Sequence, residues 1–94
     1  MSPKKKWHFY VLSCADQTLY TGVTTDVKRR LSEHNQKKGA KYTRGRTPVT
    51  VLYSREMTNR STAQKLESAF KKLSRDQKFK KLTKMVDEDL GFDS

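Results

Sequence analysis

Two strand-like runs that lie only a few residues apart constrain the fold of this chain most strongly. Trp7 to Cys14 and Thr18 to Val23 are rich in aromatic and β-branched side chains, which suit the half-buried surface of a sheet. Ala15-Asp16-Gln17 separates them, and an aspartate in a turn can accept a hydrogen bond from the backbone two residues further on. The pattern predicts an antiparallel hairpin with a three-residue loop.

The loop length determines which side chains share a face of this hairpin. With three loop residues, Cys14 lies opposite Thr18 and Tyr10 lies opposite Gly22. Because side chains alternate between faces with a period of two, Tyr10 and Tyr20 then share a face. We expect Gly22, beside them, to leave a gap where the backbone of a ligand can approach.

Directly after the hairpin the pattern becomes that of a helix. Thr25 or Asp26 is the expected N-cap. Val27 and Leu31 follow as an apolar pair at positions i and i+4. We expect this helix to end near Asn35.

The same helix carries an arginine and a histidine close to its apolar stripe. At about 100° per residue, Arg30 and His34 point to within roughly 60° of the direction of Val27. A snorkelling arginine and a hydrogen-bonded histidine at the edge of the stripe would explain both without any function. Two tyrosines on the facing strands favour another interpretation. Phenols, a guanidinium and an imidazole that converge on a gap are typical of a phosphate site.

These residues resemble the GIY-YIG nuclease superfamily, and more narrowly its small single-domain, YhbQ-like (UPF0213-type) bacterial members. His8-Phe9-Tyr10 stands at the position of the first triplet and keeps its tyrosine. Tyr20-Thr21-Gly22 keeps the tyrosine and the glycine of the second triplet. The likeness covers roughly residues 7–85. It depends on the combined spacing of Tyr10, Tyr20, Gly22, Arg30, His34 and Glu67.

The resemblance implies a catalytic site made of Tyr10, Tyr20, Arg30 and His34. Arginine suits the grip on a phosphate, because it is always charged and offers a fork of donors. A tyrosine with a pKa of about 10 is a poor base near neutral pH unless cations lower that pKa. His34, with an ordinary pKa of roughly 6.5, is the easier base on chemical grounds. The sequence leaves open which of Tyr10 and His34 acts as the general base.

The resemblance also implies a metal ion. Family members place a metal-binding glutamate on the helix that corresponds to residues 59–73, and Glu67 is the matching residue. The expected ion is Mg²⁺ or Mn²⁺, since one carboxylate with waters and substrate phosphates suffices for Mg²⁺. Without the resemblance, an ion pair between Glu67 and Lys71 at i+4 would be the simpler explanation.

The composition is strongly basic, with 21 lysines and arginines against 10 acidic residues and a net charge of +11. A compact domain this basic usually meets phosphate groups, in nucleic acid or at an anionic membrane. No apolar run approaches the roughly 20 residues of a membrane-spanning helix, and no helix has a large one-sided apolar face. DNA is therefore the expected partner, with RNA as the alternative and no membrane. The lone Cys14 fits a reducing compartment, so we expect a cytoplasmic protein.

Residues 36–47 read as a basic loop around one tyrosine. Basic side chains interleaved with an aromatic suit contacts to phosphates and stacking on a base or sugar. The alternative is a solvated loop whose tyrosine packs back on the fold. With Gly22, the predicted nucleic-acid contacts are Lys37, Lys38, Lys41, Tyr42, Arg44 and Arg46.

A third strand is predicted from Pro48 to Met57. Proline is tolerated at the first position of a strand. Strict alternation places Val49, Val51 and Tyr53 on one face of this strand.

Two helices complete the pattern, from Asn59 to Leu73 and from Ser74 to Val86. Each begins with a candidate capping box, formed by Ser61 with Gln64 and by Ser74 with Gln77 respectively. The apolar stripe of the first consists of Ala63, Leu66, Phe70 and Leu73, and that of the second of Phe79, Leu82 and Val86.

The element order β-β-α-β-α-α predicts an α+β fold, in which a small three-stranded, mainly antiparallel sheet is flanked by helices. We expect one domain over residues 1–94, with its core at about 7–86, a basic tail at 1–6 and a frayed acidic tail at 87–94. The expected function is that of a metal-dependent endonuclease that hydrolyses phosphodiester bonds in DNA, in repair or processing. The alternative is a binding module for DNA or RNA that retains the fold and no longer cuts. No separate DNA-targeting domain is evident, and a targeting partner protein is one possible source of the substrate.

Overall fold

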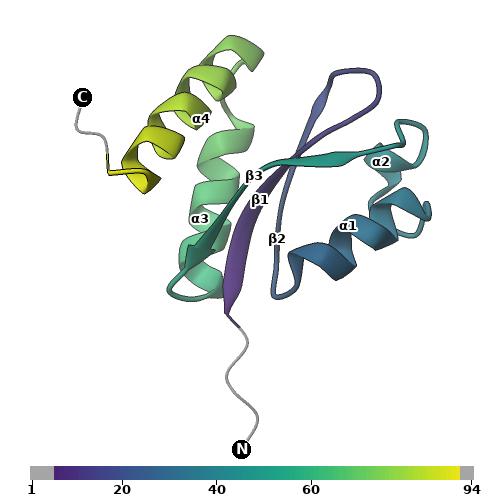
Figure 1. The fold of residues 1–94 in the computed structure, drawn as a ribbon, viewed down its shortest axis with the longest axis horizontal. Coiled ribbons are helices and arrows are strands. Elements are labelled where there is room, and N and C mark those ends of the chain that lie inside the picture. The colour runs from purple at the N-terminus through teal and green to yellow at the C-terminus, as the bar shows by residue number, and fades with distance from the viewer. Residues whose placement is uncertain (1–5, 92–94) are drawn as a thin grey trace, which may run out of the picture.

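A computed structural model describes residues 6–91 (Figure 1). Within these residues, three strands and four helices follow one another; the order is the predicted one except for the short helix at Lys41–Arg44, which was not predicted. They are β1 (Trp7–Ser13), β2 (Leu19–Thr24), α1 (Val27–Asn35), α2 (Lys41–Arg44), β3 (Thr50–Met57), α3 (Arg60–Lys71) and α4 (Arg75–Asp89).

The three strands form one antiparallel sheet in the order β2-β1-β3. Helices α1 and α2 lie on one side of it and α3 and α4 on the other, as Figure 1 shows. The predicted α+β class and the antiparallel sheet are therefore confirmed. Within residues 6–91, no helix has the length and apolarity needed to cross a membrane.

The hairpin has the predicted register. The backbone N–H of Cys14 donates to the carbonyl of Thr18 at 2.9 Å, and Tyr10 pairs with Gly22. Asp16 accepts from the backbone N–H of Thr18 at 3.1 Å, as an aspartate in a turn should. Gln17 closes the turn with a positive φ of 68°. Tyr10 and Tyr20 consequently lie on the same face of the sheet.

Side chains alternating along β1 supply a separate core on each face. Phe9 and Val11 pack on the α3 and α4 side, against Phe70, Leu82 and Met85 among others. Tyr10 and Leu12 point to the α1 side, where Cys14, Val49 and Leu31 join them. The predicted stripe of α3 is confirmed, because Ala63 and Phe70 are buried and Leu66 and Leu73 pack against the first core.

Strand β3 contains a bulge that corrects one prediction. Val11 pairs with Tyr53, whereas the next residue of β1, Leu12, pairs with Val51, so β3 carries one extra residue between them. The extra residue reverses the alternation of faces. Val49 packs with Leu12 on the α1 side, and Tyr53 packs with Val11 on the opposite side. The prediction that Val49, Val51 and Tyr53 share a face is therefore wrong.

Two other local predictions need correction. Residues 36–47 are not loop throughout, since Lys41–Arg44 form α2. The N-cap of α3 is Asn59, whose side chain accepts from the backbone N–H of Thr62 at 2.8 Å, and Ser61 lies inside the helix. The amide oxygen of Asn59 competes successfully because asparagine is at least as good an N-cap as serine.

Helix α4 begins as predicted and ends differently. The capping box of Ser74 and Gln77 is present. The buried side chains are Leu82 and Met85, whereas Phe79 and Val86 are exposed, so the predicted stripe is shifted round the helix. The helix also continues through Asp89.

The acidic end of α4 is bonded to β3. Arg55 donates to Asp89 at 2.8 Å, and the hydroxyl of Tyr53 also donates to that carboxylate. The carboxylate of Glu88 lies 3.5 Å from Arg55. The frayed acidic tail predicted from Asp87 onward is therefore wrong for the residues up to Asp89, and residues 92–94 lie outside the described part.

We predict that Asn59→Ala lowers the free energy of unfolding by about 1 kcal/mol, because it removes the acceptor for the first turn of α3. Ser61→Ala, two residues away, should change the free energy by less than about 0.5 kcal/mol, as expected for an exposed surface position. Urea unfolding followed by far-UV circular dichroism measures both. A larger loss for Ser61→Ala would contradict the assignment of the cap.

Candidate active site

The predicted catalytic residues Tyr10, Tyr20 and His34 form one aromatic cluster on the α1 side of the sheet. The ring centroids of Tyr10 and Tyr20 lie 6.4 Å apart, and that of His34 lies 5.0 Å from Tyr20. The hydroxyl of Tyr10 lies 3.2 Å from Nε2 of His34. Residues from β1, β2 and α1 therefore meet at one point, because the hairpin register and the helical spacing both direct them there.

Gly22 has a different role from the one predicted. A Cβ at this position would lie 2.5 Å from the hydroxyl oxygen of Tyr10 and 2.7 Å from its Cζ. The space beside Gly22 is thus filled by the ring of Tyr10. The expected gap for a nucleic-acid backbone is absent there, and the glycine instead allows Tyr10 to reach His34.

A hydrogen-bond chain fixes the tautomer of His34. The hydroxyl of Thr43, on α2, donates its single proton to the carbonyl of Ala40 at 2.9 Å. The same oxygen lies 2.8 Å from Nδ1 of His34, so it must accept a proton there. Neutral His34 then has no proton on Nε2, and the hydroxyl of Tyr10 donates to that nitrogen. The order of donation is Tyr10 to His34 to Thr43 to Ala40.

Burial and a nearby cation set the charge states in this cluster. Burial, followed by the charge of Arg30, lowers the pKa of His34, which is therefore neutral near pH 7. Burial raises the pKa of Tyr10 to about 12, although the neighbouring guanidinium of Arg30 acts in the opposite direction. This shift is opposite to the one a tyrosine base needs. In the free protein Tyr10 keeps its proton and shares it with His34.

Arg30 lies at the border between this cluster and solvent. It belongs to the second turn of α1. Asp26 caps the N-terminus of this helix, because its side chain accepts from the backbone N–H of Arg29 at 3.0 Å. Its guanidinium lies beside the hydroxyl of Tyr10 and donates to Glu33 at 3.2 Å. Its side chain is 32% exposed, so the guanidinium is available to a phosphate from solution.

Glu67 lies on α3, on the other side of the sheet from α1 (Figure 1). Its negative charge adds a small contribution to the raised pKa of Tyr10, after those of burial, Arg30 and Tyr20. The ion pair with Lys71 predicted from the i+4 spacing is present at 3.5 Å. The carboxylate remains 21% exposed.

The donor chemistry around Glu67 fits a magnesium ion better than a metal held by protein alone. Within residues 6–91, no three His, Cys, Asp or Glu side chains gather into a metal-binding cluster. Mg²⁺ keeps several waters and commonly takes one or two carboxylates together with substrate phosphates. A single accessible carboxylate such as that of Glu67 can supply the protein's part of such a site.

The predicted surface is only partly formed. Tyr10 is 2% exposed and His34 has no exposed surface, so these two lie beneath the surface. Tyr20, Arg30 and Glu67 are the members that solvent reaches. The expectation that all five line one accessible concave surface is therefore wrong for Tyr10 and His34.

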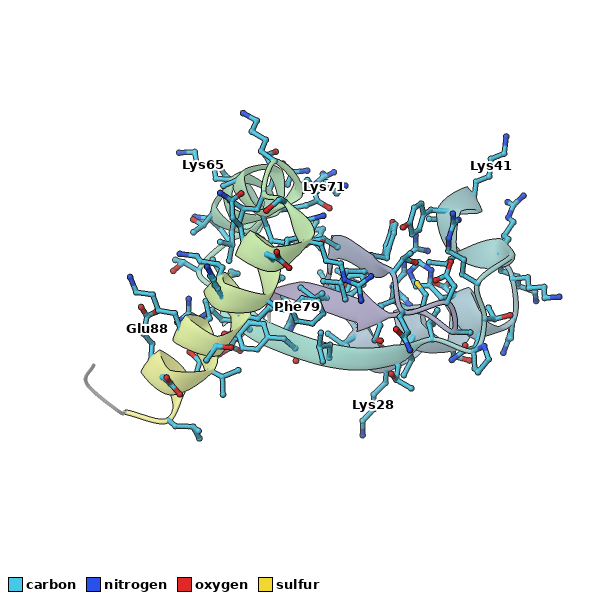
Figure 2. The ribbon with its side chains drawn as sticks, turned by 90° about the horizontal axis from the view of Figure 1, so that it is seen from above. Lys28, Lys41, Lys65, Lys71, Phe79 and Glu88 are labelled. Carbon is cyan, nitrogen blue, oxygen red and sulfur yellow. The ribbon has the colours of Figure 1, made fainter. Side chains whose placement is uncertain are left out.

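The basic residues of the segment between α1 and β3 have unequal environments. Lys37, Lys38, Lys41 and Arg44 are exposed, and Lys41 extends away from the body of the protein in Figure 2. Arg46 instead holds the segment in place. It donates to Asp16 in the hairpin loop at 2.9 Å and to the carbonyl of Tyr42 at 2.7 Å.

Tyr42 packs back on the fold, as one of the two predictions had it. Its ring stacks on Tyr20 with centroids 5.9 Å apart and an interplanar angle of 30°. The guanidinium of Arg46 lies 4.1 Å from the centre of the same ring. Despite these two contacts, Tyr42 remains 40% exposed.

Three residues of this site were missed at the level of sequence, and each acts through α1. Thr43 accepts from His34, and a Cβ on Gly39 would collide with the ring of His34. The side chain of Asn35 bonds both backbone groups of Val49, at 3.0 and 2.7 Å, and so ties the end of α1 to the start of β3. No local pattern marks them, because each partner lies at least five positions away in the chain.

Comparison with known proteins agrees with this arrangement. A model of the GIY-YIG catalytic domain matches residues 6–81, and the chain belongs to this nuclease family. Within the family, the chain is similar to UPF0213 proteins. It is 55% identical over 71 residues to one from Halobacterium salinarum, covering 76% of this chain and 92% of the relative. It is also 55% identical over 71 residues to one from Streptococcus agalactiae, covering 76% and 81%.

Two solved structures share the fold. The solution NMR structure of the protein EF2693 from E. faecalis is 47% identical and superimposes with a TM-score of 0.63, covering 90% of this chain and 91% of that one. The solution NMR structure of the UPF0213 protein BH0048 from Bacillus halodurans is 40% identical, with a TM-score of 0.56 and 83% of each chain covered.

We predict that Thr43→Val changes the tautomer of His34, because valine keeps the shape and removes the acceptor for Nδ1–H. In the wild type, long-range ¹H–¹⁵N spectra of the imidazole should show a protonated Nδ1 and a bare Nε2. The variant should gain the other tautomer and lose roughly 1–3 kcal/mol of stability, the usual cost of an unsatisfied buried polar group. Thr43→Ser should restore the wild-type spectrum. A protonated Nε2 in the wild type would contradict the assignment.

A second prediction concerns alkaline pH. The pKa of Tyr10 is raised to about 12 in the folded protein, against about 10 in the unfolded chain. A group with a raised pKa contributes stability that is fully present below pH 10 and is lost as the pH rises toward 12. Tyr53 contributes in the same direction, because burial and its bond to Asp89 also raise its pKa. The free energy of unfolding should therefore fall between pH 10 and 12, and less steeply in Tyr10→Phe. An equal slope in both proteins would contradict the shift.

Proposed function

We propose that this protein is a metal-dependent endonuclease that hydrolyses phosphodiester bonds in DNA, with a role in the repair or processing of branched or damaged structures. The observation that carries the proposal is the meeting of Arg30 with the bonded pair of Tyr10 and His34. Glu67 on α3 is the carboxylate that we assign to the metal. A nuclease site needs a phosphate grip, a path for a proton and a place for a metal, and these residues supply all three. A cytoplasmic location and a partner protein that presents the substrate are part of the same proposal.

Arg30 is the phosphate ligand in this proposal. Its guanidinium is always charged and grips the non-bridging oxygens of a phosphate through a fork of donors. Because the negative charge on those oxygens grows in the transition state, the arginine stabilises the transition state more than the bound substrate. Tyr20, half-buried beside it, orients the same phosphate through its hydroxyl.

Tyr10 and His34 form the proton path. The attacking water gives a proton to the hydroxyl oxygen of Tyr10 as the phenolic proton passes to Nε2 of His34. The oxygen of that water forms a bond to phosphorus, the bond to the leaving oxygen breaks, and solvent supplies the proton for the leaving group. His34 thus acts through Tyr10, since it has no exposed surface from which to reach the water itself.

The charge states of the free protein oppose this transfer. Burial raises the pKa of Tyr10 and lowers that of His34, so moving the proton between them is uphill. The charge of Arg30 favours loss of the phenolic proton, but the same charge disfavours its arrival on His34, so Arg30 alone does not drive the transfer. Mg²⁺ or Mn²⁺ held by Glu67, waters and the substrate would supply further positive charge near the leaving oxygen.

A second candidate function is that of a nucleic-acid-binding module, for DNA or RNA, that keeps the fold without cutting. The burial of Tyr10 favours it, since only 2% of this residue is exposed. The basic surface would serve either function, so salt dependence does not separate them.

Cleavage assays with Mg²⁺ or Mn²⁺ on nicked, flapped, branched and linear DNA, and on structured RNA, test the proposal. We expect Arg30→Ala to lower the rate by roughly 10²–10³, as for other electrostatic donors in the transition state. Arg30→Lys should recover part of this rate, because it keeps the charge and removes only the fork. Tyr10→Phe should be inactive, because the water then has no group to take its proton.

Folding and purity are the controls. Each variant must first show the wild-type circular dichroism spectrum and melting curve, since Arg30 also lies against the core. Cleavage that persists in the Arg30→Ala, Glu67→Ala double variant would identify a contaminant. Tight binding without cleavage of any substrate, and without dependence on Mg²⁺, would reject the nuclease and favour the binding module.

A further inference from the structure

A groove runs along the free edge of β2, next to the candidate active site. In the order β2-β1-β3, β2 has a single neighbour, so its outer edge is open. Two hollows of about 270 and 180 Å³ adjoin each other there. Both include Leu19, Tyr42 and Lys78 in their walls, and Tyr20 lines the larger one. The groove therefore begins at Tyr20, the half-buried tyrosine of the site, and extends past Leu19.

One wall of the groove is positively charged. Lys71 from α3 and Arg75 and Lys78 from the first turns of α4 line it. Glu67 pairs with Lys71. Within residues 6–91, neither Arg75 nor Lys78 has a carboxylate within ion-pair distance. The wall thus offers two cations that no acidic side chain of the described chain neutralises.

The position of Lys78 is unusual for a lysine. It lies four residues before Leu82 and seven before Met85, which are the buried residues of α4. At this helical spacing the three side chains share a face, and an apolar residue at position 78 would extend the core. Lys78 is instead half-buried, with its ammonium group 6.0 Å from the ring centre of Phe70 and its end at the groove. A cation held in that place suits an anion in the groove.

The opposite wall is aromatic. Tyr42 lines both hollows and is 40% exposed, and the stack on Tyr20 and the contact with Arg46 hold its ring in place. In Figure 2, Lys71 lies on the side of α3 that is turned toward the sheet and α2, whereas Lys65 points away from them. A ligand in the groove would meet cations from α3 and α4 on one side and an aromatic ring from α2 on the other.

We propose that this groove binds an unpaired strand of nucleic acid that leads into the active site. Basic grooves with aromatic side chains bind single strands through phosphate contacts and contacts to the bases. A duplex hides the faces of its bases within the stack, so the aromatic wall contributes only when the strand is unpaired. The inference rests on the proposed nuclease in one respect, the direction of the strand toward Arg30. It would make a flap, an overhang or a free single strand the preferred substrate over a continuous duplex.

Binding without cleavage tests the groove independently of catalysis. Fluorescence anisotropy in EDTA would compare labelled 12-nucleotide single strands of DNA and of RNA with the matching DNA duplex. The single strands should bind at least about fivefold more tightly than the duplex. The DNA and RNA arms distinguish the two sources of an unpaired strand.

Arg75→Glu and Lys78→Gln should each weaken single-strand binding by roughly tenfold. Each should also lower the slope of log K against log salt by about 0.7 for every phosphate that the variant no longer neutralises. Lys65→Glu makes the same change of charge as Arg75→Glu on the outer side of α3, and should weaken binding less than about threefold. Arg75 is exposed, so its variant tests the groove even if the half-buried position 78 does not tolerate substitution.

Tyr42→Ala should weaken single-strand binding by roughly tenfold, within the range seen when aromatic residues that contact bases are removed. Tyr42→Phe should leave it unchanged, because the ring and not the hydroxyl makes the contact. Equal weakening in Lys65→Glu and Arg75→Glu, or equal weakening for duplex and single strand in Tyr42→Ala, would overturn the proposal. If the variants change single-strand binding as expected but the protein cleaves no substrate, only the nuclease proposal is rejected. If the protein cleaves DNA and these variants do not change binding, only the groove proposal is rejected.

Discussion

The hydrogen bond between Tyr10 and His34 is the interaction on which the arrangement of this protein depends. It joins β1 to α1, and through Thr43 it continues to α2. Buried polar groups are tolerated when their hydrogen bonds are satisfied, and here each nitrogen of the imidazole has a partner. His34 is the one fully buried residue of α1. A leucine at that position would give the helix a more apolar stripe, and the imidazole is accommodated there because both of its nitrogens are hydrogen-bonded.

Two glycines make this bond possible by leaving space. Gly22 accommodates the hydroxyl of Tyr10, and Gly39 accommodates the ring of His34. Neither has a positive φ, so their value lies in the absent Cβ rather than in backbone freedom. The tyrosine and the glycine of the second triplet therefore act on different residues: Tyr20 lies against His34 and Tyr42, while Gly22 positions Tyr10.

The hairpin, its register and the helix order could be predicted from the sequence because they depend on contacts close along the chain. The three-residue loop alone places Tyr10 and Tyr20 on one face. The bulge in β3 could not be foreseen, since it arises from pairing with β1 about forty residues away and leaves no local mark. Site residues were recognised through their spacing, but their exposure was not, because burial of Tyr10 depends on how α1 and β2 close over it. The structural role of Arg46 could not be predicted either, because Asp16, which accepts its hydrogen bond, lies thirty residues earlier in the chain.

The edge of the sheet explains how one small domain can combine a site on one face with charges on the other. Along β2, Tyr20 points to the α1 side, whereas Leu19 and Thr21 point to the α3 side. A ligand at this open edge can therefore contact residues from both layers without crossing the sheet. Lys71 of α3 reaches the edge from one layer, and Tyr20 and Tyr42 from the other. Were β2 a central strand, a further strand would separate these groups. The position of β2 at the edge is thus what lets side chains from both layers of so small a domain line the same hollow.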